Sequence, residues 1–130
     1  MTVEPNLQTI LKSMNPIFHE GEYVFCTVEN TEAIDPNDLV MTFRETEGTT
    51  LIIRKETADK LNLKYDFIAA WISLMVHSSL EAVGLTASFS TALADEGISC
   101  NVVAGYYHDH LFIKHSDSQK AIAVLEKLSL

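Results

Sequence analysis

The 130-residue sequence has few cysteines and no long hydrophobic run, and each absence excludes a class of protein. The two cysteines, Cys26 and Cys100, are too few for the disulfide framework of a small secreted domain. Each lies in an apolar, strand-like stretch, so we expect two buried thiols, with a disulfide as the alternative. The longest apolar stretch, FIAAWISLMV, has about 10 residues, whereas a membrane-spanning helix needs about 20. The N-terminus has an early acid and no apolar core, which predicts no signal peptide.

Positive charge is also scarce. Lys and Arg number 9 against 18 Asp and Glu, which gives a formal net charge of −9. The acid excess is spread over both halves of the chain, and no basic stripe is present to neutralise phosphates. We therefore expect no nucleic-acid partner and no attachment to an anionic membrane. With 47% apolar residues, the composition predicts a soluble, acidic, cytoplasmic protein with one globular core or two small ones.

The first half of the chain predicts a helix, three strands and a short helix. Apolar residues at helical spacing indicate a helix over residues 2–16, which Pro16 ends. Stretches rich in β-branched and aromatic residues predict strands at 22–29, 39–45 and 49–55. The last two are joined by a short loop containing Gly48, which is typical of an antiparallel hairpin. A short helix is predicted over residues 55–63.

The second half predicts the order strand, helix, strand, strand, helix. Residues 65–77 are almost continuously apolar, which indicates a strand buried on both faces, or else a short buried helix. Trp71 in this stretch is expected in the core. A helix should follow, with Thr86 as its N-cap and Gly97 just past its end. We further predict strands at 98–107 and 111–115, a turn at 108–110, and a last helix with Ser116 and Gln119 as a capping box.

The order of elements from residue 66 onward is most of a ferredoxin-like βαββαβ unit, in which two helices cover one face of an antiparallel sheet. The first half looks like a degenerate second copy, without an exact residue repeat. The predicted fold class is therefore α+β, with two ferredoxin-like modules of antiparallel sheets covered by helices. We place these modules at residues 1–65 and 66–130. The linker between them is not rich in Gly or Ser, so we expect the modules to pack together.

The second half also resembles a known family. It contains WISLMV, AVGLT, FSTALADEGI and SCNVV in that order, and this series is similar to an ACT domain. The first half, with HEGEYVFCTV and EGTTLIIRKETA, is similar to the front part of small two-ACT bacterial proteins of unassigned activity. Many ACT domains have PG in the loop after the first strand, whereas this chain has Val83 and Gly84. That departure leaves the shape of the loop open.

The resemblance implies a non-catalytic regulatory protein that binds a small ligand, an amino acid, at an interface between two ACT modules. Carried over to this sequence, the ligand contacts are Ser78, Ser79, Leu80, Gly84, Leu85, Thr86, Asn101, Val102 and Val103. The residue types agree with such a site, because a helix N-terminus presents N–H groups to a carboxylate and glycine permits close approach. The alternative is that Gly84 only turns the chain and Thr86 only caps the helix.

With no enzyme attached, a regulator of this kind would act on a partner protein or by forming a homo-oligomer. The alternative function is a protein-interaction or dimerisation module that binds no ligand. In that case the edges of the sheets or the faces of the helices would pair two copies.

No catalytic, metal or cofactor site is predicted. His108 and His110 have the spacing of two ligands on one strand face, but we expect a solvated turn there, with ligand gating or pH sensing as alternatives. His77 cannot readily serve Ser78 as a base, because adjacent residues of an extended segment point to opposite faces. The acids of residues 29–38 lack the glycine and the distal glutamate of a calcium loop, which favours a solvated surface.

Overall fold

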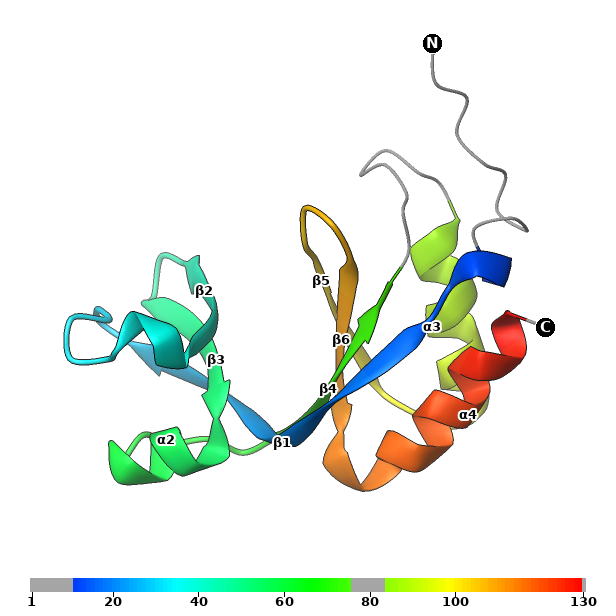
Figure 1. Cartoon of the computed structure of the whole chain (residues 1–130). Helices are drawn as coiled ribbons and strands as arrows, with labels where there is room; N and C mark the ends of the chain where they lie inside the picture. The colour runs from blue at the N-terminus through cyan, green and yellow to red at the C-terminus, as the bar shows by residue number, and fades with distance from the viewer. Residues whose placement is uncertain (1–10, 76–83, 130) are drawn as a thin grey trace, which may run out of the picture. The chain divides into compact units, whose positions relative to one another are not determined.

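A computed structural model gives the fold and describes residues 11–75 and 84–129 (Figure 1). Its elements, in chain order, are β1 (Pro16–Val28), η1 (Pro36–Asp38), β2 (Leu39–Arg44), β3 (Thr49–Arg54), α2 (Lys55–Lys60), β4 (Ile68–Leu74), α3 (Leu85–Asp95), β5 (Cys100–Ala104), β6 (Asp109–Lys114), η2 (His115–Asp117) and α4 (Ser118–Leu128). Residues 11–13 are also helical; the rest of the helix predicted over residues 2–16 lies largely outside the described residues. Among the described helices, none has the length and apolar character needed to cross a membrane.

The six strands form a sheet in the order β2-β3-β1-β4-β6-β5. The pairs β1–β3, β2–β3 and β5–β6 are antiparallel. The predicted α+β class, with antiparallel strands and covering helices, is therefore confirmed.

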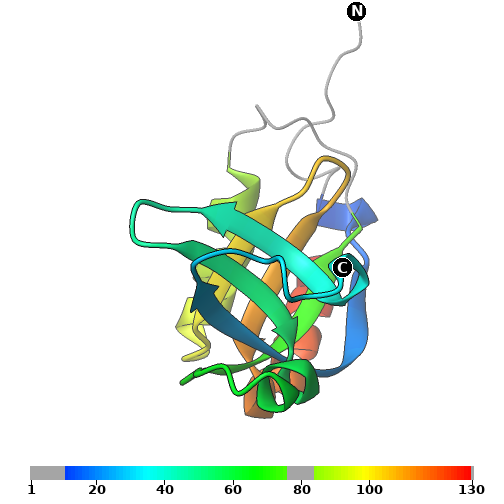
Figure 2. The same ribbon diagram turned by 90° about the vertical axis from the view of Figure 1, so that its left-hand side faces the viewer.

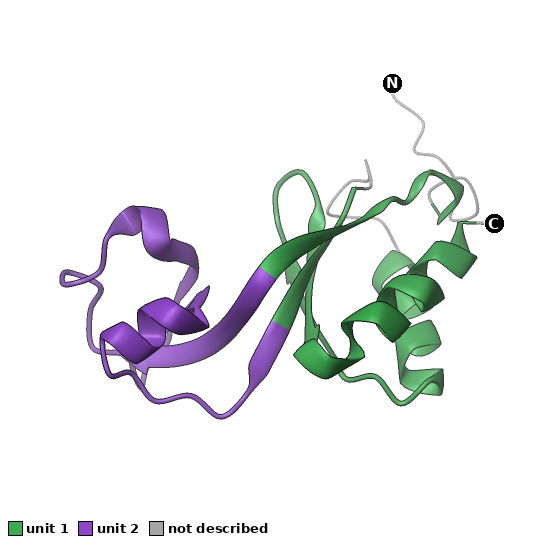
Figure 3. Cartoon of the chain, turned by 60° about the horizontal axis from the view of Figure 1, so that its bottom comes forward, with its two compact units in different colours: residues 1–20, 70–130 green, residues 21–69 purple. Residues whose placement is uncertain are grey.

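The chain divides into two compact units, which Figure 3 colours separately. Unit 1 contains residues 1–20 and 70–130, and unit 2 contains residues 21–69. Both boundaries fall inside strands, one in β1 and the other in β4, rather than in a Gly/Ser-rich loop. The module division at residues 1–65 and 66–130 stays a prediction.

The core of unit 1 lies between its strands and the helices α3 and α4. Its fully buried members include Ala70, Ile72, Leu74, Phe89, Leu93, Leu111, Ile113, Ala121 and Leu125. The core residues of β4 and β6 alternate along each strand, as expected where one face of a sheet is covered by helices. The residues between them, among them Trp71 and Ser73, therefore belong to the other face of the sheet, which we call the helix-free face.

Helix α3 ends as the sequence predicts. Gly97 has φ +74° and follows the C-cap residue Glu96. The Gly97 N–H donates to the Ala94 carbonyl, and the Ile98 N–H donates to the Leu93 carbonyl. These two bonds form a Schellman motif, which needs a residue in the left-handed region. Ile98 is buried and joins the core, so the end of the helix also contributes to packing.

Helix α4 begins later than the sequence predicts. The 3₁₀ turn η2 occupies residues 115–117, and α4 starts at Ser118 with Asp117 as an N-cap that makes no side-chain capping bond. The predicted capping box of Ser116 and Gln119 is therefore wrong. Ser118 is only 8% exposed, and its burial favours a helix that begins at this residue. Ser116 therefore lies in the preceding turn rather than at the N-cap.

Unit 2 contains the predicted hairpin of β2 and β3, whose strands are seen side by side in Figure 2. The Glu45 N–H donates to the Gly48 carbonyl and closes its turn. The core of unit 2 includes Val24 and Cys26 of β1, with Ala58 of α2 packed against them. No α-helix lies between β1 and β2; residues 29–38 form an irregular connection that contains the short 3₁₀ helix η1, and Ile34 of this connection is buried in the same core.

A repeat of 60 residues relates the two units. Residues 51–60 (LIIRKETADK) and 111–120 (LFIKHSDSQK) have the same pattern of buried and exposed positions, although few residues are identical. The strand pairing has the same offset: Thr42 lies opposite Leu51, and Val102 lies opposite Leu111. The strand order is also palindromic when β1, β2 and β3 are matched with β4, β5 and β6. The degenerate second copy predicted from the sequence is thus present in the strands and in α2, but it lacks a counterpart of α3.

We predict that Phe89→Ala lowers the free energy of unfolding by about 3–5 kcal/mol, because it leaves a cavity in the core of unit 1. Phe89 is fully buried between α3 and the sheet. The matched control is Phe43→Ala, since Phe43 is 63% exposed and should cost far less. Urea denaturation of both variants measures the difference; equal losses would contradict the assignment of the core.

Candidate functional site

The predicted ligand loop lies only partly within the described residues. Ser78, Ser79 and Leu80 fall outside them, so their placement stays a prediction. Gly84 is described and has φ +92°, a left-handed conformation that glycine adopts readily. It immediately precedes α3 and is the N-cap of that helix.

The predicted cap at Thr86 is wrong. Helix α3 begins at Leu85, one residue before Thr86, and Gly84 has no side chain with which to cap it. Leu85 is 4% exposed and belongs to the core of unit 1, which holds it inside the helix, while Thr86 is exposed. At this end the Gly84 carbonyl accepts bonds from the N–H and the hydroxyl of Ser88, at 3.0 and 2.9 Å. The first turn of α3 therefore begins without a side-chain cap.

The predicted contacts on residues 101–103 lie on β5, the terminal strand of the sheet. Asn101 is exposed, and its side-chain N–H donates to the Phe112 carbonyl of β6 at 3.1 Å. Val102 and Val103 are half-buried and lie opposite Leu111 and His110.

The structure distributes these predicted contacts over both faces of the sheet. Leu85 and Val102 are brought together at the helix-side core. Because side chains alternate along a strand, Asn101 and Val103 point to the helix-free face instead. A ligand at the start of α3 could therefore contact only part of the predicted set through side chains, and the remaining contacts would be made by backbone groups.

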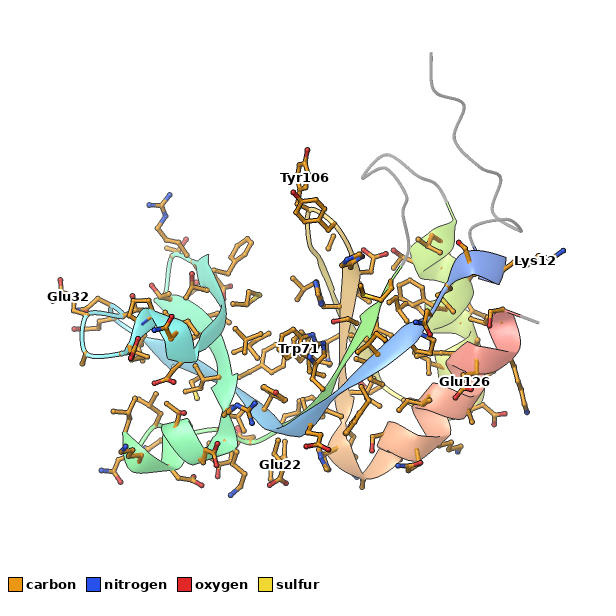
Figure 4. The ribbon with its side chains drawn as sticks, in the orientation of Figure 1. Lys12, Glu22, Glu32, Trp71, Tyr106 and Glu126 are labelled. Atoms are coloured by element: carbon orange, nitrogen blue, oxygen red, sulfur yellow. The ribbon has the colours of Figure 1, made fainter. Side chains whose placement is uncertain are left out.

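A second group of polar and aromatic side chains, linked to one another, lies on the helix-free face of unit 1. Ser73 of β4 is 3% exposed, and its Oγ lies 2.7 Å from His19 Nε2 of β1 and 2.8 Å from His110 Nδ1 of β6. The Nε1–H of Trp71, labelled in Figure 4, donates to the same His110 Nδ1 at 3.1 Å. The His19 ring stacks on Trp71 with a centroid distance of 3.7 Å and an interplanar angle of 13°. We call these four residues the histidine cluster.

The sequence did not predict the histidine cluster. Residues 108–110 were expected to form a turn, but the turn spans 105–108, closed by the Gly105 N–H bond to the His108 carbonyl, and β6 begins at Asp109. The aromatic tip at Tyr106 and Tyr107, rather than the polar HDH segment, is the part that faces solvent, with 83% and 74% exposure. Trp71 was expected in the core and is only partly buried. The sequence signal available for the cluster was the spacing of Trp71 and Ser73, because residues two apart on a strand lie on the same face.

The cluster disfavours positive charge. Burial lowers the pKa of His110, the nearby His108 lowers it further, and Asp109 opposes that effect. Burial also lowers the pKa of His19, with His110 as the second cause. Asp109 has its pKa raised by burial, against the effect of the two neighbouring imidazoles. Both histidines of the cluster are therefore held in the neutral form more strongly than in an unfolded chain.

No metal centre is evident in the part of the chain that the structure describes, since no three His, Cys, Asp or Glu side chains come together there in a suitable group. In unit 2, Lys55 Nζ lies 3.0 Å from Asp59 Oδ2, and the Tyr65 hydroxyl donates to Asp59 at 2.6 Å. Lys55 and Asp59 border a shallow depression that also includes Gly21 and Arg54. Another shallow depression of unit 2 is lined by Phe25, Cys26, Thr27, Thr50, Lys64, Tyr65 and Asp66.

The strand order and the two helices of unit 1 are those of the ferredoxin-like class of α+β domains. Family comparison agrees, because residues 2–70 match one ACT domain model and residues 67–127 match a second. The chain therefore belongs to the ACT domain family, as the sequence resemblance implied. A comparison with curated protein sequences finds no match.

Solved structures of similar fold include a protein of unknown function from Vibrio cholerae, described as a possible transport protein. It is 44% identical, with a TM-score of 0.86, and the match covers 95% of this chain and 96% of that one. An Agrobacterium tumefaciens protein is 17% identical with a TM-score of 0.66 and 89% coverage of both chains. The ligand-free regulatory subunit of aspartate kinase from Thermus thermophilus is 8% identical with a TM-score of 0.62, covering 87% of this chain and 95% of that one.

We predict that both thiols of the folded protein react slowly with an alkylating reagent. Cys26 is buried, and burial raises the pKa of the half-buried Cys100 to about 11. At pH 8 the thiolate fraction of Cys100 should be about 200-fold below that of an ordinary thiol with a pKa near 8.5. Mass spectrometry of iodoacetamide-treated protein measures each rate, with urea-unfolded protein as the control. Rapid labelling of Cys100 in folded protein would contradict its burial.

Proposed function

We propose that this protein is a non-catalytic regulatory protein that binds a small ligand, an amino acid, at the start of α3. The proposed contacts are Ser78, Ser79, Leu80, Gly84, Leu85, Thr86, Asn101, Val102 and Val103. The ligand site lies at an interface between two ACT modules, one of them residues 66–130. Binding shifts the population toward one arrangement of modules or subunits, and a partner protein or a homo-oligomer reads the change.

One observation carries this proposal: the left-handed Gly84 begins α3 without a side-chain cap. The first N–H groups of a helix have no partner within the helix and carry a partial positive charge, which suits a carboxylate. Glycine also leaves room for a ligand to approach the backbone. The proposed set also contains Ser78, Ser79 and Asn101, whose hydroxyl and amide groups are of the types that hydrogen-bond an amino group and a carboxylate.

The relatives support the same class of function. The regulatory subunit of aspartate kinase shares the fold over nearly its whole length, so a chain of this size and topology can serve as a separate regulatory part of an enzyme. The chain is matched by ACT models along nearly all of its length. The aspartate kinase likeness is one of fold, so it supports the class and leaves the identity of the amino acid to experiment.

The second candidate is an interaction module without a ligand. It is favoured by the position of β5 and β2 at the two ends of the strand order, since a terminal strand offers unpaired backbone groups to another chain. A second copy could then pair with one of these edges. The protein's response to amino acids distinguishes this candidate from the first.

We expect one or two of the twenty amino acids to stabilise the purified protein in a thermal-shift screen. A ligand that binds only the folded state adds about 2.7 kcal/mol at 100 times its Kd. For a domain of this size that is a rise in Tm of roughly 5–15 °C. No rise with any amino acid, after dialysis of unfolded and refolded protein to remove a retained ligand, would favour the interaction module.

A second prediction locates the site. Gly84→Val should abolish the ligand-dependent rise in Tm, because a β-branched residue is strained at positive φ and blocks approach to the backbone. Gly97→Val is the matched control, since Gly97 also has positive φ but lies at the other end of the same helix, with open space around it. Both variants should lose basal stability, and only the first should lose the response. An unchanged response in folded Gly84→Val would move the site elsewhere.

A further inference from the structure

The histidine cluster joins three strands of unit 1 through one hydroxyl group. Ser73 of the central strand β4 lies between His19 of β1 and His110 of β6, with both N–O distances below 3 Å. A serine hydroxyl has one proton to donate, and it can accept bonds through its lone pairs. The number of protons on the two imidazoles therefore decides whether all these contacts can be hydrogen bonds.

The indole fixes the tautomer of His110. Trp71 Nε1–H can only donate, so His110 Nδ1 must accept, and the proton of the neutral ring is on Nε2. The Ser73 hydroxyl then donates to the same Nδ1, and its oxygen accepts from the Nε2–H of His19. In this arrangement, when His110 is neutral, the Trp71 and Ser73 donors share its Nδ1 lone pair, and the His19 donor bonds to the Ser73 oxygen. A positive charge on His19 is compatible with it, because His19 Nε2 is already a donor.

Protonation of His110 is not compatible with the arrangement. It places a proton on Nδ1, so the atom that accepts from both Trp71 and Ser73 becomes a donor facing two other donors. Ser73 can then turn its proton only toward His19, and only if His19 releases the proton on Nε2. With both rings protonated, two positive charges and two N–H groups converge on one buried hydroxyl oxygen, which is strongly unfavourable.

Among the groups that face His110 from the described strands, none accepts a hydrogen bond from a protonated Nδ1 in place of the bonds that are lost. Those groups are Trp71 and Ser73 from β4, His19 from β1, the uncharged Val103 opposite it on β5, and His108, Asp109 and Gly105 from the hairpin itself. Asp109 raises the pKa of His110, but burial and His108 each lower that pKa by more. His110 also packs tightly on the turn, since a methyl group built on Gly105 would lie 3.0 Å from Nε2.

Unit 2 shows that the fold does not require this cluster. The 60-residue repeat places Thr50 where unit 1 has His110, and β1 is the strand that matches β4. Thr27 lies directly opposite Thr50, and the Thr50 hydroxyl donates to the Glu45 carboxylate. A pair of threonines thus satisfies the same position without an ionisable ring.

We propose that His19, Ser73 and His110 form a proton-operated switch in unit 1. With His110 neutral, the hydrogen-bonded cluster ties the first part of β1 to β4 and β6. Protonation of His110 breaks the bonds from Trp71 and Ser73, withdraws the hydroxyl from His19, and loosens β1 at its unit 1 end. The proton comes from solvent and is returned to it, so no other reactant is needed.

The direction of the pH effect follows from the two imidazoles. Each has its pKa lowered below the ordinary value of 6.5, so the unfolded chain binds more protons than the folded chain as the pH falls through that value. The stabilising effect of the cluster is therefore complete above about pH 6.5 and declines below it. None of the three residues of this switch belongs to the proposed ligand set, although Val103 of that set lies opposite His110.

The first test uses the single tryptophan of the chain. In a nitrogen-15 correlation spectrum, the one indole N–H signal belongs to Trp71, and it should shift on acidification with the same midpoint as the ring protons of His110. That midpoint should lie below about 6.5. The protection factors of the backbone amides of residues 17–20, which correct for the slower intrinsic exchange at low pH, should fall in the same range and should fall more than those of β3. An indole signal that does not move, or a His110 midpoint at or above 6.5, would overturn the proposal.

The second test uses variants. In His110→Asn the amide oxygen can accept from Trp71 and Ser73 in place of Nδ1, and it does not titrate. The loss of Tm between pH 7.5 and 5.5 should fall by about half or more in this variant. His115→Asn, outside the cluster in η2, is the matched control and should retain the full loss. If the loss of Tm on acidification is unchanged in folded His110→Asn, the proposed switch is wrong, and this outcome does not depend on the result of the ligand screen.

Discussion

The burial of alternate side chains of β4 and β6 beneath α3 and α4 is the interaction on which unit 1 depends. Ala70, Ile72 and Leu74 cannot face the helices unless the residues between them face the other way. The positions of Trp71 and Ser73 on the helix-free face follow from this constraint. So does the position of His110, next to the buried Leu111 on β6. The polar cluster is therefore located by apolar packing on the opposite side of the sheet.

The 60-residue repeat separates what the fold requires from what it permits. The two copies share strand register and the pattern of burial on β3–α2 and β6–α4, although their side chains differ. Their helix-side positions remain apolar in both copies. Their helix-free positions differ in chemistry, with threonines in unit 2 and histidine and serine in unit 1. The residues that distinguish the copies are thus found where packing against a helix does not constrain them.

The sequence predicted the elements whose signals are local. Gly48 marked the hairpin turn and Gly97 the end of α3, since each position favours glycine for its own backbone conformation. Local preference failed where burial competed with it: threonine is a good N-cap, but the burial of Leu85 starts α3 one residue before Thr86. The histidine cluster could not be predicted, because its bonds link residues 54 and 37 positions apart through the register of three strands. The sequence placed Trp71 in the core and did not indicate that its side chain contacts His19 and His110.

The junction of β3 with α2 has a mechanical consequence. Arg54 is both the last residue of the strand and the N-cap of the helix, so no loop separates the two elements. In the other copy, Lys114 is likewise the last residue of β6 and the N-cap of the 3₁₀ turn η2, which continues directly into α4. A displacement along β3 or β6 would therefore be passed to the helix that follows it, because no flexible loop intervenes in either copy.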